Sequence, residues 1–403
     1  MSIRFIHQYF FPDHSSVSQV ISQIAFYLAG NGEAVSVICS QNRYDGAQGS
    51  SLPSTDRTRG VDIYRCWGPS FGRGSLAGRI LDMASFYLLS GIRLLISPPA
   101  ETNVFLTNPP FFSVVGALFR KIRGGRFVYI LMDVYPDIMV RAGMLKEGGC
   151  FTRILRWISR FTVSSADTVI VLGEDMRQVA ICSGAPSEKV VIIRNWADPI
   201  KICPIAHEEN RFRREWGLYG KFVVEYSGNL GVSHSFEDLL AVAESVADND
   251  DIRFLFIGGG IRFRELERAV ASRGLGNVIM MPYQKSSDLA HSLSAGDVHY
   301  VSLRTGFEGL VVPSKAYGIM AAGRPMIYQG DEKGDIAQMI KRERCGIVIP
   351  EGDRERLKEG ILRFYRDRAM VARMGMFARR ALEEKYSASI GLANYQRILA
   401  AGN

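Results

Sequence analysis

The chain has 403 residues, of which 47% are hydrophobic and 22% are charged. This length exceeds one ordinary domain, and the composition excludes an intrinsically disordered chain. The net charge of +8 indicates an anionic partner, such as a nucleotide, a nucleic acid or an anionic lipid surface.

The six cysteines are scattered, without a CxxC pair or a cluster of histidines. This pattern argues against a zinc site and against a disulfide framework, and it fits a reducing compartment. The first eleven residues are too short and too polar for a signal peptide. We therefore expect a cytoplasmic protein without a zinc site. No cofactor is expected either.

The first half of the chain alternates between strands and helices. A strand is predicted over residues 3–9, a helix around residues 20–28 and a second strand over residues 34–39. Further buried strands are predicted over residues 103–107, 127–132, 168–171 and 190–193. This order predicts a doubly wound parallel sheet, which binds ligands beyond the C-terminal ends of its strands. Asp13 and Asp133 follow two of these strands, so we expect both on the ligand side.

Residues 79–98 form the most apolar stretch, but Asp82 and Arg93 interrupt it as a membrane span. It is either a buried helix or a helix partly exposed to lipid. A basic cluster over residues 120–126 lies nearby in the sequence, and over residues 151–161 arginines alternate with apolar and aromatic side chains. This combination suits a helix lying on an anionic bilayer, although a solvated helix face would show the same pattern. No nucleic-acid-binding module is visible, so we expect no nucleic acid partner.

The strand and helix pattern restarts near residue 222. Strands are predicted over residues 222–226 and 252–257, the first followed by the loop of residues 227–231 and the second by the glycines at 258–260. The remaining strands are predicted over residues 278–281, 299–303, 326–328 and 346–349, and the chain after Arg354 is predicted to be helical. We therefore predict an N-terminal domain over residues 1–198, a C-terminal domain over residues 199–375, and a last helix over residues 376–403 that packs back toward the first domain.

Residues 312–325, VPSKAYGIMAAGRP, follow a predicted buried strand and a loop. Ser314 is the predicted N-cap of a short helix, and Lys315 lies in its first turn. Backbone N–H groups and one flexible cation at this position suit a diphosphate. An ordinary strand–helix–strand unit with a surface lysine is the alternative.

Seven segments together resemble the retaining GT-B glycosyltransferases of family four over nearly the whole chain. In chain order they are HQYFFPD, DVYPD, EKVVIIRNWADP, YSGNLG, FIGGG, SLSAGDVHYV and VPSKAYGIMAAGRP. They look most similar to bacterial surface-polysaccharide enzymes of the colanic-acid and O-antigen type. The resemblance implies an α/β fold of two Rossmann-like doubly wound domains facing across a cleft. It also places a nucleotide sugar on the C-terminal domain and an acceptor on the N-terminal domain.

The resemblance also assigns roles to individual residues. The donor phosphates would meet Gly228, Asn229, Ser314 and Lys315. The base and ribose would be lined by Gly258, Gly260, Tyr283 and Lys285, and the donor sugar would meet Glu308, Gly309 and Leu310. On the acceptor side the candidates are Asp13, Ser15, Ser16 and Asp133, of which both aspartates could instead cap their loops. The candidate catalytic residues are Asp133 and Glu308.

Two departures from the family pattern affect the donor site. The family's arginine and lysine in the first C-terminal-domain loop are replaced by Asn229 and by His234 or Ser235. The family's second glutamate is replaced by Gly318, so the ribose contact is absent or comes from Glu308 or Asp335.

One DxD triplet, Asp248 to Asp250, could mark a metal-bound nucleotide sugar. It falls between a predicted helix and the start of a strand, away from the ligand side, and a solvated turn is the expected interpretation. His7 and His299 lie in or beside apolar strands and are expected in the core.

The expected function is a retaining, metal-independent transfer of sugar from a UDP- or GDP-sugar to a polyprenyl-diphosphate-linked saccharide. The expected location is the inner face of the plasma membrane, bound peripherally. Two alternatives remain open: a GT-B nucleotide-sugar epimerase, and a non-catalytic nucleotide-sugar-binding scaffold. An NAD oxidoreductase fits poorly, because no glycine-rich loop reads GxGxxG with an acidic residue about twenty positions later.

Overall fold

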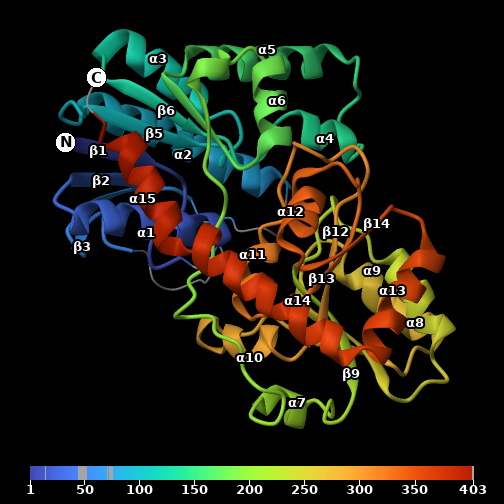
Figure 1. Ribbon diagram of the computed structural model, residues 1–403. Coiled ribbons are helices and arrows are strands. Elements are labelled where there is room, and N and C mark those ends of the chain that lie inside the picture. Colours follow the sequence, from blue (N-terminus) through green and yellow to red (C-terminus); the bar gives the residue numbers. More distant parts are fainter. Residues whose placement is uncertain (14, 44–51, 70, 72–75, 402–403) are drawn as a thin grey trace. The chain divides into compact units, whose positions relative to one another are not determined.

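The computed structural model describes residues 1–13, 15–43, 52–69, 71 and 76–401 (Figure 1). The chain divides into two compact units. The first unit consists of Met1–Ile193 together with Leu392–Asn403, and the second consists of Arg194–Gly391. Each unit is built around one sheet, and each is described separately below.

The first unit contains an eight-stranded sheet in the order β3-β4-β2-β1-β5-β6-β7-β8. All neighbouring strands are parallel except β3 and β4, which form an antiparallel pair. The strands are β1 (Ser2–Ile6), β2 (Ala34–Ser40), β3 (Thr55–Thr58), β4 (Val61–Cys66), β5 (Thr102–Leu106), β6 (Arg126–Ile130), β7 (Thr168–Val171) and β8 (Val190–Ile192).

The connecting helices of the first unit are α1 (Ser16–Gly30), α2 (Leu76–Ile96), α3 (Ser113–Arg123), α4 (Asp137–Arg141), α5 (Cys150–Ser165) and α6 (Glu174–Cys182). The last part of α15 (Ala388–Leu399) also belongs here: the Leu399 carbonyl accepts from Thr102 Oγ1 at 3.5 Å, and the Ala401 carbonyl accepts from Arg126 Nη1 at 2.7 Å. The sequence analysis did not predict the β3–β4 hairpin, because the four residues of β3 are all polar.

The second unit contains a six-stranded parallel sheet in the order β11-β10-β9-β12-β13-β14. Its strands are β9 (Phe222–Asn229), β10 (Ile252–Gly259), β11 (Val278–Pro282), β12 (Val298–Ser302), β13 (Met326–Gln329) and β14 (Gly346–Ile349). Its helices are α7 (Arg211–Glu215), α8 (Glu237–Ser245), α9 (Phe263–Arg273), α10 (Leu289–Leu293), α11 (Lys315–Ala321), α12 (Asp335–Glu343), α13 (Arg354–Arg366), α14 (Arg368–Ala381) and the start of α15.

These two sheets confirm the predicted fold class of two Rossmann-like α/β units. Near-continuous apolar runs form the central strands because a parallel sheet is covered on both faces, and Phe222, Phe254 and Tyr300 are fully buried. His7 and His299 are also fully buried, as predicted for core histidines.

Strand order identifies where each sheet reverses direction. In the second unit successive strands β9, β10 and β11 extend one way from β9, whereas β12, β13 and β14 extend the other way. The reversal therefore lies between β9 and β12. In the first unit it lies between β1 and β5. Ligands of open α/β sheets bind beyond the strand ends at such a reversal, so these two edges are where functional side chains are sought.

The ends of β9 and β10 differ from the prediction. Residues 227–229 were predicted as a loop, but β9 and β10 continue side by side to Asn229 and Gly259, with Gly228 opposite Gly258. Gly258 has a φ of +143°, and a Cβ there would lie 2.1 Å from the Gly228 carbonyl oxygen. Only glycine fits this position, and it lets both strands reach the ligand edge.

We predict that Gly258→Ala lowers the free energy of unfolding by at least about 2 kcal/mol, since it adds backbone strain to a backbone clash. Gly276→Ala is the matched control, because a Cβ there meets nothing within 4 Å. Urea unfolding measures both variants. Equal stability of the two variants would contradict the close approach of β9 and β10.

Candidate functional site

Lys315 and Tyr226 meet at the reversal of the second sheet. Tyr226 lies in β9, and Lys315 is the first residue of α11, after β12. Lys315 Nζ donates to Tyr226 Oη at 2.6 Å and lies 3.9 Å from the centre of the tyrosine ring. Tyr226 Oη in turn donates to the Asn229 carbonyl at 2.8 Å. The lysine predicted as a flexible cation is therefore held in one place by the end of β9.

Ser314 was predicted to be the N-cap of α11, but its side chain does not cap the helix. Its backbone is already helical, with φ −64° and ψ −19°, and its side chain makes no capping hydrogen bond. A capping serine normally has an extended backbone, which lets its hydroxyl reach the next turn. Since α11 is also only seven residues long, Lys315 is the stronger anion-binding feature of this segment.

The charge of Lys315 is weakly compensated. Burial lowers the pKa of its ammonium group to about 7. Its neighbour His234 carries no charge near neutral pH, because burial and then Lys315 lower the pKa of its imidazole to about 3. His234 Nδ1 donates to the Ser302 carbonyl at 2.6 Å, which fixes the ring. Among the described residues Lys315 makes no ion pair, so an anion placed here would stabilise its charged form.

The loops after β9 and β10 are joined by backbone hydrogen bonds. Leu230 N donates to the Gly259 carbonyl at 2.7 Å, and Arg262 N donates to the Leu230 carbonyl at 3.2 Å. Gly260 has no space for a side chain, since a Cβ would lie 2.5 Å from Asn229 Oδ1. The candidates Gly228, Asn229, Gly258 and Gly260 thus form one rigid edge.

Arg262 is a charged residue of this edge that the sequence analysis missed. Its Nη1 donates to the His234 carbonyl at 2.8 Å, its Nη2 pairs with Glu237, and its Nε pairs with Glu265 at 3.0 Å. Its position directly after the glycine run was the signal available. Because two carboxylates already neutralise it, Arg262 supports the loop rather than replacing the missing family arginine.

The predicted base and sugar residues occupy neighbouring loops. Tyr283 is 59% exposed and follows β11, and its ring lies against Gly259, where a Cβ would approach within 2.9 Å. Lys285 is also exposed. Glu308 Oε2 accepts from Gly306 N at 2.7 Å, whereas Oε1 is buried and lacks a hydrogen-bond partner. The unpaired oxygen is an acceptor available to a ligand hydroxyl.

Gly309 and Leu310, which follow Glu308, are both buried. Leu310 packs its side chain into the interior, and its backbone N–H already donates to Phe307. A donor sugar would therefore meet the backbone of this segment and not the leucine side chain.

The first unit places the acceptor candidates after β1 and β6. Asp13 Oδ1 accepts from Ser15 N at 2.8 Å, which is the loop-capping geometry considered as its alternative role. Ser15 Oγ is buried without a hydrogen-bond partner, and Ser16 begins α1. Among the described residues of this loop, the Ser15 hydroxyl is thus a polar group available to a ligand.

Asp133 follows β6, and its backbone N–H donates to Thr107 Oγ1 at 3.3 Å. Burial raises the pKa of the Asp133 carboxyl to about 6. Thr107, which the sequence analysis missed, sits at the end of β5 and also accepts from Met132 N at 2.9 Å. It therefore fixes the backbone that carries Asp133, close to the reversal of the first sheet.

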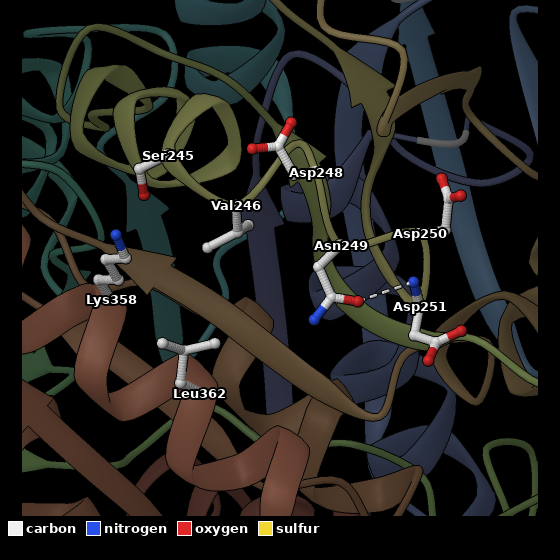
Figure 2. A pocket seen from close by; sticks show the side chains of 8 residues that line it. All are labelled: Ser245, Val246, Asp248, Asn249, Asp250, Asp251, Lys358 and Leu362. Carbon is white, nitrogen blue, oxygen red and sulfur yellow. Dashed lines mark hydrogen bonds between the residues drawn. The ribbon is translucent and has the colours of Figure 1, made fainter.

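The DxD triplet lies at the opposite end of the second sheet. Asp248, Asn249 and Asp250 precede β10 and line an open pocket of about 560 Å³ together with Asp251 and Lys358 (Figure 2). Asn249 Oδ1 accepts from Asp251 N at 3.0 Å, as in a solvated turn. The glycine edge is at the other end of β10. Across the described ranges, no three or more His, Cys, Asp or Glu side chains are grouped to hold a metal ion.

The apolar segment at residues 79–98 lies in α2, which has one buried and one exposed face. Phe86 and Leu94 are buried, whereas Leu88 and Ile96 are exposed. The helix is therefore not buried all round, and exposure of its open face to lipid stays a prediction. None of the helices in the described part of the chain is long and apolar enough to span a bilayer.

A second exposed apolar face belongs to α5. Phe151, Ile154 and Trp157 are exposed there, with Trp157 at 66%, next to the exposed arginines Arg153 and Arg160. Leu155 faces the core. The cations and apolar side chains that alternate in the sequence are thus exposed together on the surface of the folded unit.

Comparison with known proteins gives matches to both units. The model described as "Glycosyl transferase 4-like domain" matches residues 16–196, and the model described as "Glycosyl transferases group 1" matches residues 221–367. The probable glycosyltransferase WbjE of Pseudomonas aeruginosa is 29% identical over 291 residues, covering 72% of each chain. The putative colanic acid biosynthesis glycosyl transferase WcaI of Escherichia coli K12 is 25% identical over 342 residues, covering 82% of this chain and 83% of the relative.

Solved structures share the fold at low sequence identity. Sucrose-phosphate synthase from Thermosynechococcus elongatus superposes with a TM-score of 0.78 at 15% identity, covering 100% of both chains. Anabaena HepE in complex with UDP and glucose superposes with a TM-score of 0.71 at 15% identity, covering 99% of both chains.

We predict that Lys315→Met changes stability in a pH-dependent way. Between pH 7 and about 10 the unfolded chain keeps the Lys315 proton while the folded chain releases it. Stability of the wild type relative to the variant should therefore rise as the pH is raised through this range. The measurement is the difference in Tm between the two proteins at pH 6.5, 7.5, 8.5 and 9.5. A difference that does not change with pH would show that Lys315 stays charged.

Proposed function

We propose that this chain, a GT-B glycosyltransferase of family four, transfers a sugar from a UDP- or GDP-sugar to a saccharide carried on a polyprenyl diphosphate. We propose further that the transfer retains the anomeric configuration, needs no metal ion and serves the synthesis of a surface polysaccharide. The observation that carries the donor part is Lys315 at the sheet reversal, which is partly buried and makes no ion pair with any described residue. The name of WcaI, a putative colanic acid biosynthesis glycosyl transferase, supports the polysaccharide part.

The donor diphosphate is proposed to bind over the edge formed by Gly228, Asn229, Gly258 and Gly260, with Ser314 and Lys315 opposite. A departing diphosphate needs charge stabilisation, and an ammonium group in a partly buried site supplies it strongly. HepE, which has the same fold, is described in complex with UDP and glucose. Binding of the anion would raise the pKa of Lys315, so donor binding takes up a proton above about pH 7.

The nucleoside and the sugar are assigned to the loops around that edge. Tyr283 offers an exposed ring for stacking on the base, and Lys285 follows it. Glu308 Oε1 is the proposed acceptor for a donor hydroxyl, beside the Gly309–Leu310 backbone. These groups need no metal ion to hold the donor.

The acceptor is assigned to the first unit, with the Ser15 hydroxyl and Asp133 as its main contacts and Asp13 and Ser16 as supports. Asp133 ionises near pH 6, so above that pH its carboxylate can accept the hydrogen of the attacking hydroxyl. Transfer should therefore fall as the pH drops below about 6.

We predict that UDP or GDP raises the Tm of the wild type, and that Lys315→Ala weakens nucleotide affinity by at least about tenfold, as expected for loss of a charged hydrogen bond. Lys358→Ala is the matched control, because Lys358 lines the pocket at the other end of the sheet. A Tm titration with each nucleotide gives both affinities. Equal Tm shifts for the two variants would contradict the proposal that the donor binds at Lys315.

Product analysis with the preferred nucleotide sugar separates the remaining alternatives. A glycosyltransferase consumes donor only with an acceptor, or slowly by hydrolysis, and NMR of the new anomeric centre tests retention. An epimerase converts the donor without any acceptor. A scaffold binds the donor and gives neither product.

The membrane part of the proposal depends on the exposed faces of α2 and α5. Apolar side chains surrounded by arginines bind an anionic interface by burial and by charge. We place the protein peripherally on the inner face of the plasma membrane, where lipid-linked saccharides are reached from the cytoplasm.

We predict that a Phe151→Ser, Trp157→Ser double variant binds phosphatidylglycerol vesicles at least about tenfold more weakly, since each exposed ring buries apolar area in the interface. Met376→Ser, at an exposed apolar residue of the second unit, is the control. Co-sedimentation at low and high salt measures binding. Binding that is absent, or that does not respond to salt, would refute the membrane surface.

A further inference from the structure

Three arginines of the first unit gather at the N-terminal edge of its sheet. Arg4 in β1 is only 4% exposed, and its Nη2 donates to the Pro98 carbonyl at 2.6 Å. Arg123, the last residue of α3, donates from Nη2 to the Ser97 carbonyl at 3.4 Å. Arg93 of α2 belongs to the same turn of chain, because the Ser97 hydroxyl donates to its carbonyl at 2.7 Å.

No carboxylate compensates these three cations. Within the described ranges neither Arg4 nor Arg93 nor Arg123 makes an ion pair. The neighbour of Arg4 on β5 is Asn103, which contributes a neutral amide. Arg93 lies over the ring of Tyr64, 4.6 Å from its centre, which is a contact with a neutral side chain.

Several donors of the cluster are also unsatisfied. Arg4 Nε, Arg4 Nη1 and Arg93 Nε are buried without a hydrogen-bond partner. Burial lowers the pKa of the Arg4 guanidinium. The Tyr64 phenol raises this pKa, and the charges of Arg123 and Arg93 lower it further. Buried guanidinium groups are normally paired, because an unpaired buried charge is costly. The cluster therefore has the charge and the free donors of a site for an anion.

The rim of this cluster is apolar. Ile92, Leu95 and Ile96 of α2 and Ile122 of α3 are exposed, the last at 71%, and they are close in sequence to Arg93 and Arg123. A site for a free inorganic anion needs no such rim. Cations set among exposed aliphatic side chains suit an anion that carries hydrocarbon chains.

We propose that Arg4, Arg93 and Arg123 bind the phosphate of an anionic membrane lipid, with the aliphatic side chains of α2 and α3 in the acyl region. This inference rests on the proposed membrane association, and it adds a discrete headgroup site to a general basic surface. The site is distinct from the proposed acceptor site. Arg123 precedes β6 whereas Asp133 follows it, so the two lie at opposite edges of the sheet.

The first test compares two variants that lose the same charge. Arg93→Gln with Arg123→Gln removes the headgroup site, and Arg153→Gln with Arg160→Gln removes two exposed arginines of α5. Vesicles contain either phosphatidylglycerol or oleate at equal charge, so that only the first offers a phosphate. We expect the wild type to prefer phosphatidylglycerol, the first variant to lose that preference, and the second to keep it while binding both vesicles more weakly.

Equal loss in the two variants, or no preference by the wild type, would overturn the headgroup site while leaving general membrane binding intact. Failure of membrane association itself would appear as no vesicle binding by any protein. Thermal shift with UDP is recorded for each variant, and an unchanged shift shows that the donor site of the second unit is unaffected.

The second test uses Arg4→Met, which replaces a buried unpaired charge with an apolar side chain. We expect an equal or higher Tm in the absence of ligand and loss of the preference for phosphatidylglycerol. A Tm lower by several degrees would show that Arg4 is a satisfied structural residue and would overturn the proposal. Glycerol 3-phosphate raising the wild-type Tm, with vesicle preference unchanged in the Arg93, Arg123 variant, would overturn the lipid assignment in favour of a soluble phosphate.

Discussion

The approach of β9 to β10 at Gly228 and Gly258 is the constraint on which the second unit depends. Because Gly258 carries no side chain, the two strands stay paired to their last residues. The end of β9 then carries Tyr226 beneath Lys315, and the end of β10 carries the glycines that fix the following turn. The Tyr226 side chain thereby holds a cation at the sheet reversal, and among the described residues no carboxylate pairs with it.

The two sheets carry different chemical groups at their reversals. At the reversal of the second sheet the charged group is the ammonium of Lys315, which favours a negatively charged ligand. At the reversal of the first sheet the polar groups are a carboxyl and hydroxyls, which favour an uncharged polyol. In both cases burial disfavours the charged form of the group. It lowers the pKa of Lys315 to about 7 and raises the pKa of Asp133 to about 6. Each unit thus has, at its sheet reversal, a titratable group whose pKa lies close to physiological pH.

Sequence patterns predicted the strands well because parallel strands are buried on both faces and read as apolar runs. They failed for β3, whose residues are polar, and for the ends of β9 and β10, where glycine was interpreted as a loop. The candidate site residues were predicted from the order of the motifs, but three properties of the sites became visible only in the structure. Ser314 is helical and caps nothing, Arg262 is already neutralised, and Asp13 is occupied by Ser15. No periodicity reports which hydrogen bonds a polar side chain has already formed.

The second unit is inserted within the first. Its two ends are joined, since Ala197 pairs with Ser387 and Trp196 lies directly against Gly391. Only after this return does the chain supply residues 392–401, whose carbonyls accept from Thr102 and Arg126 at the edge of the first sheet. During synthesis, then, the first unit cannot be completed until the whole second unit has been made. The unit that begins first in the sequence is therefore the one completed last.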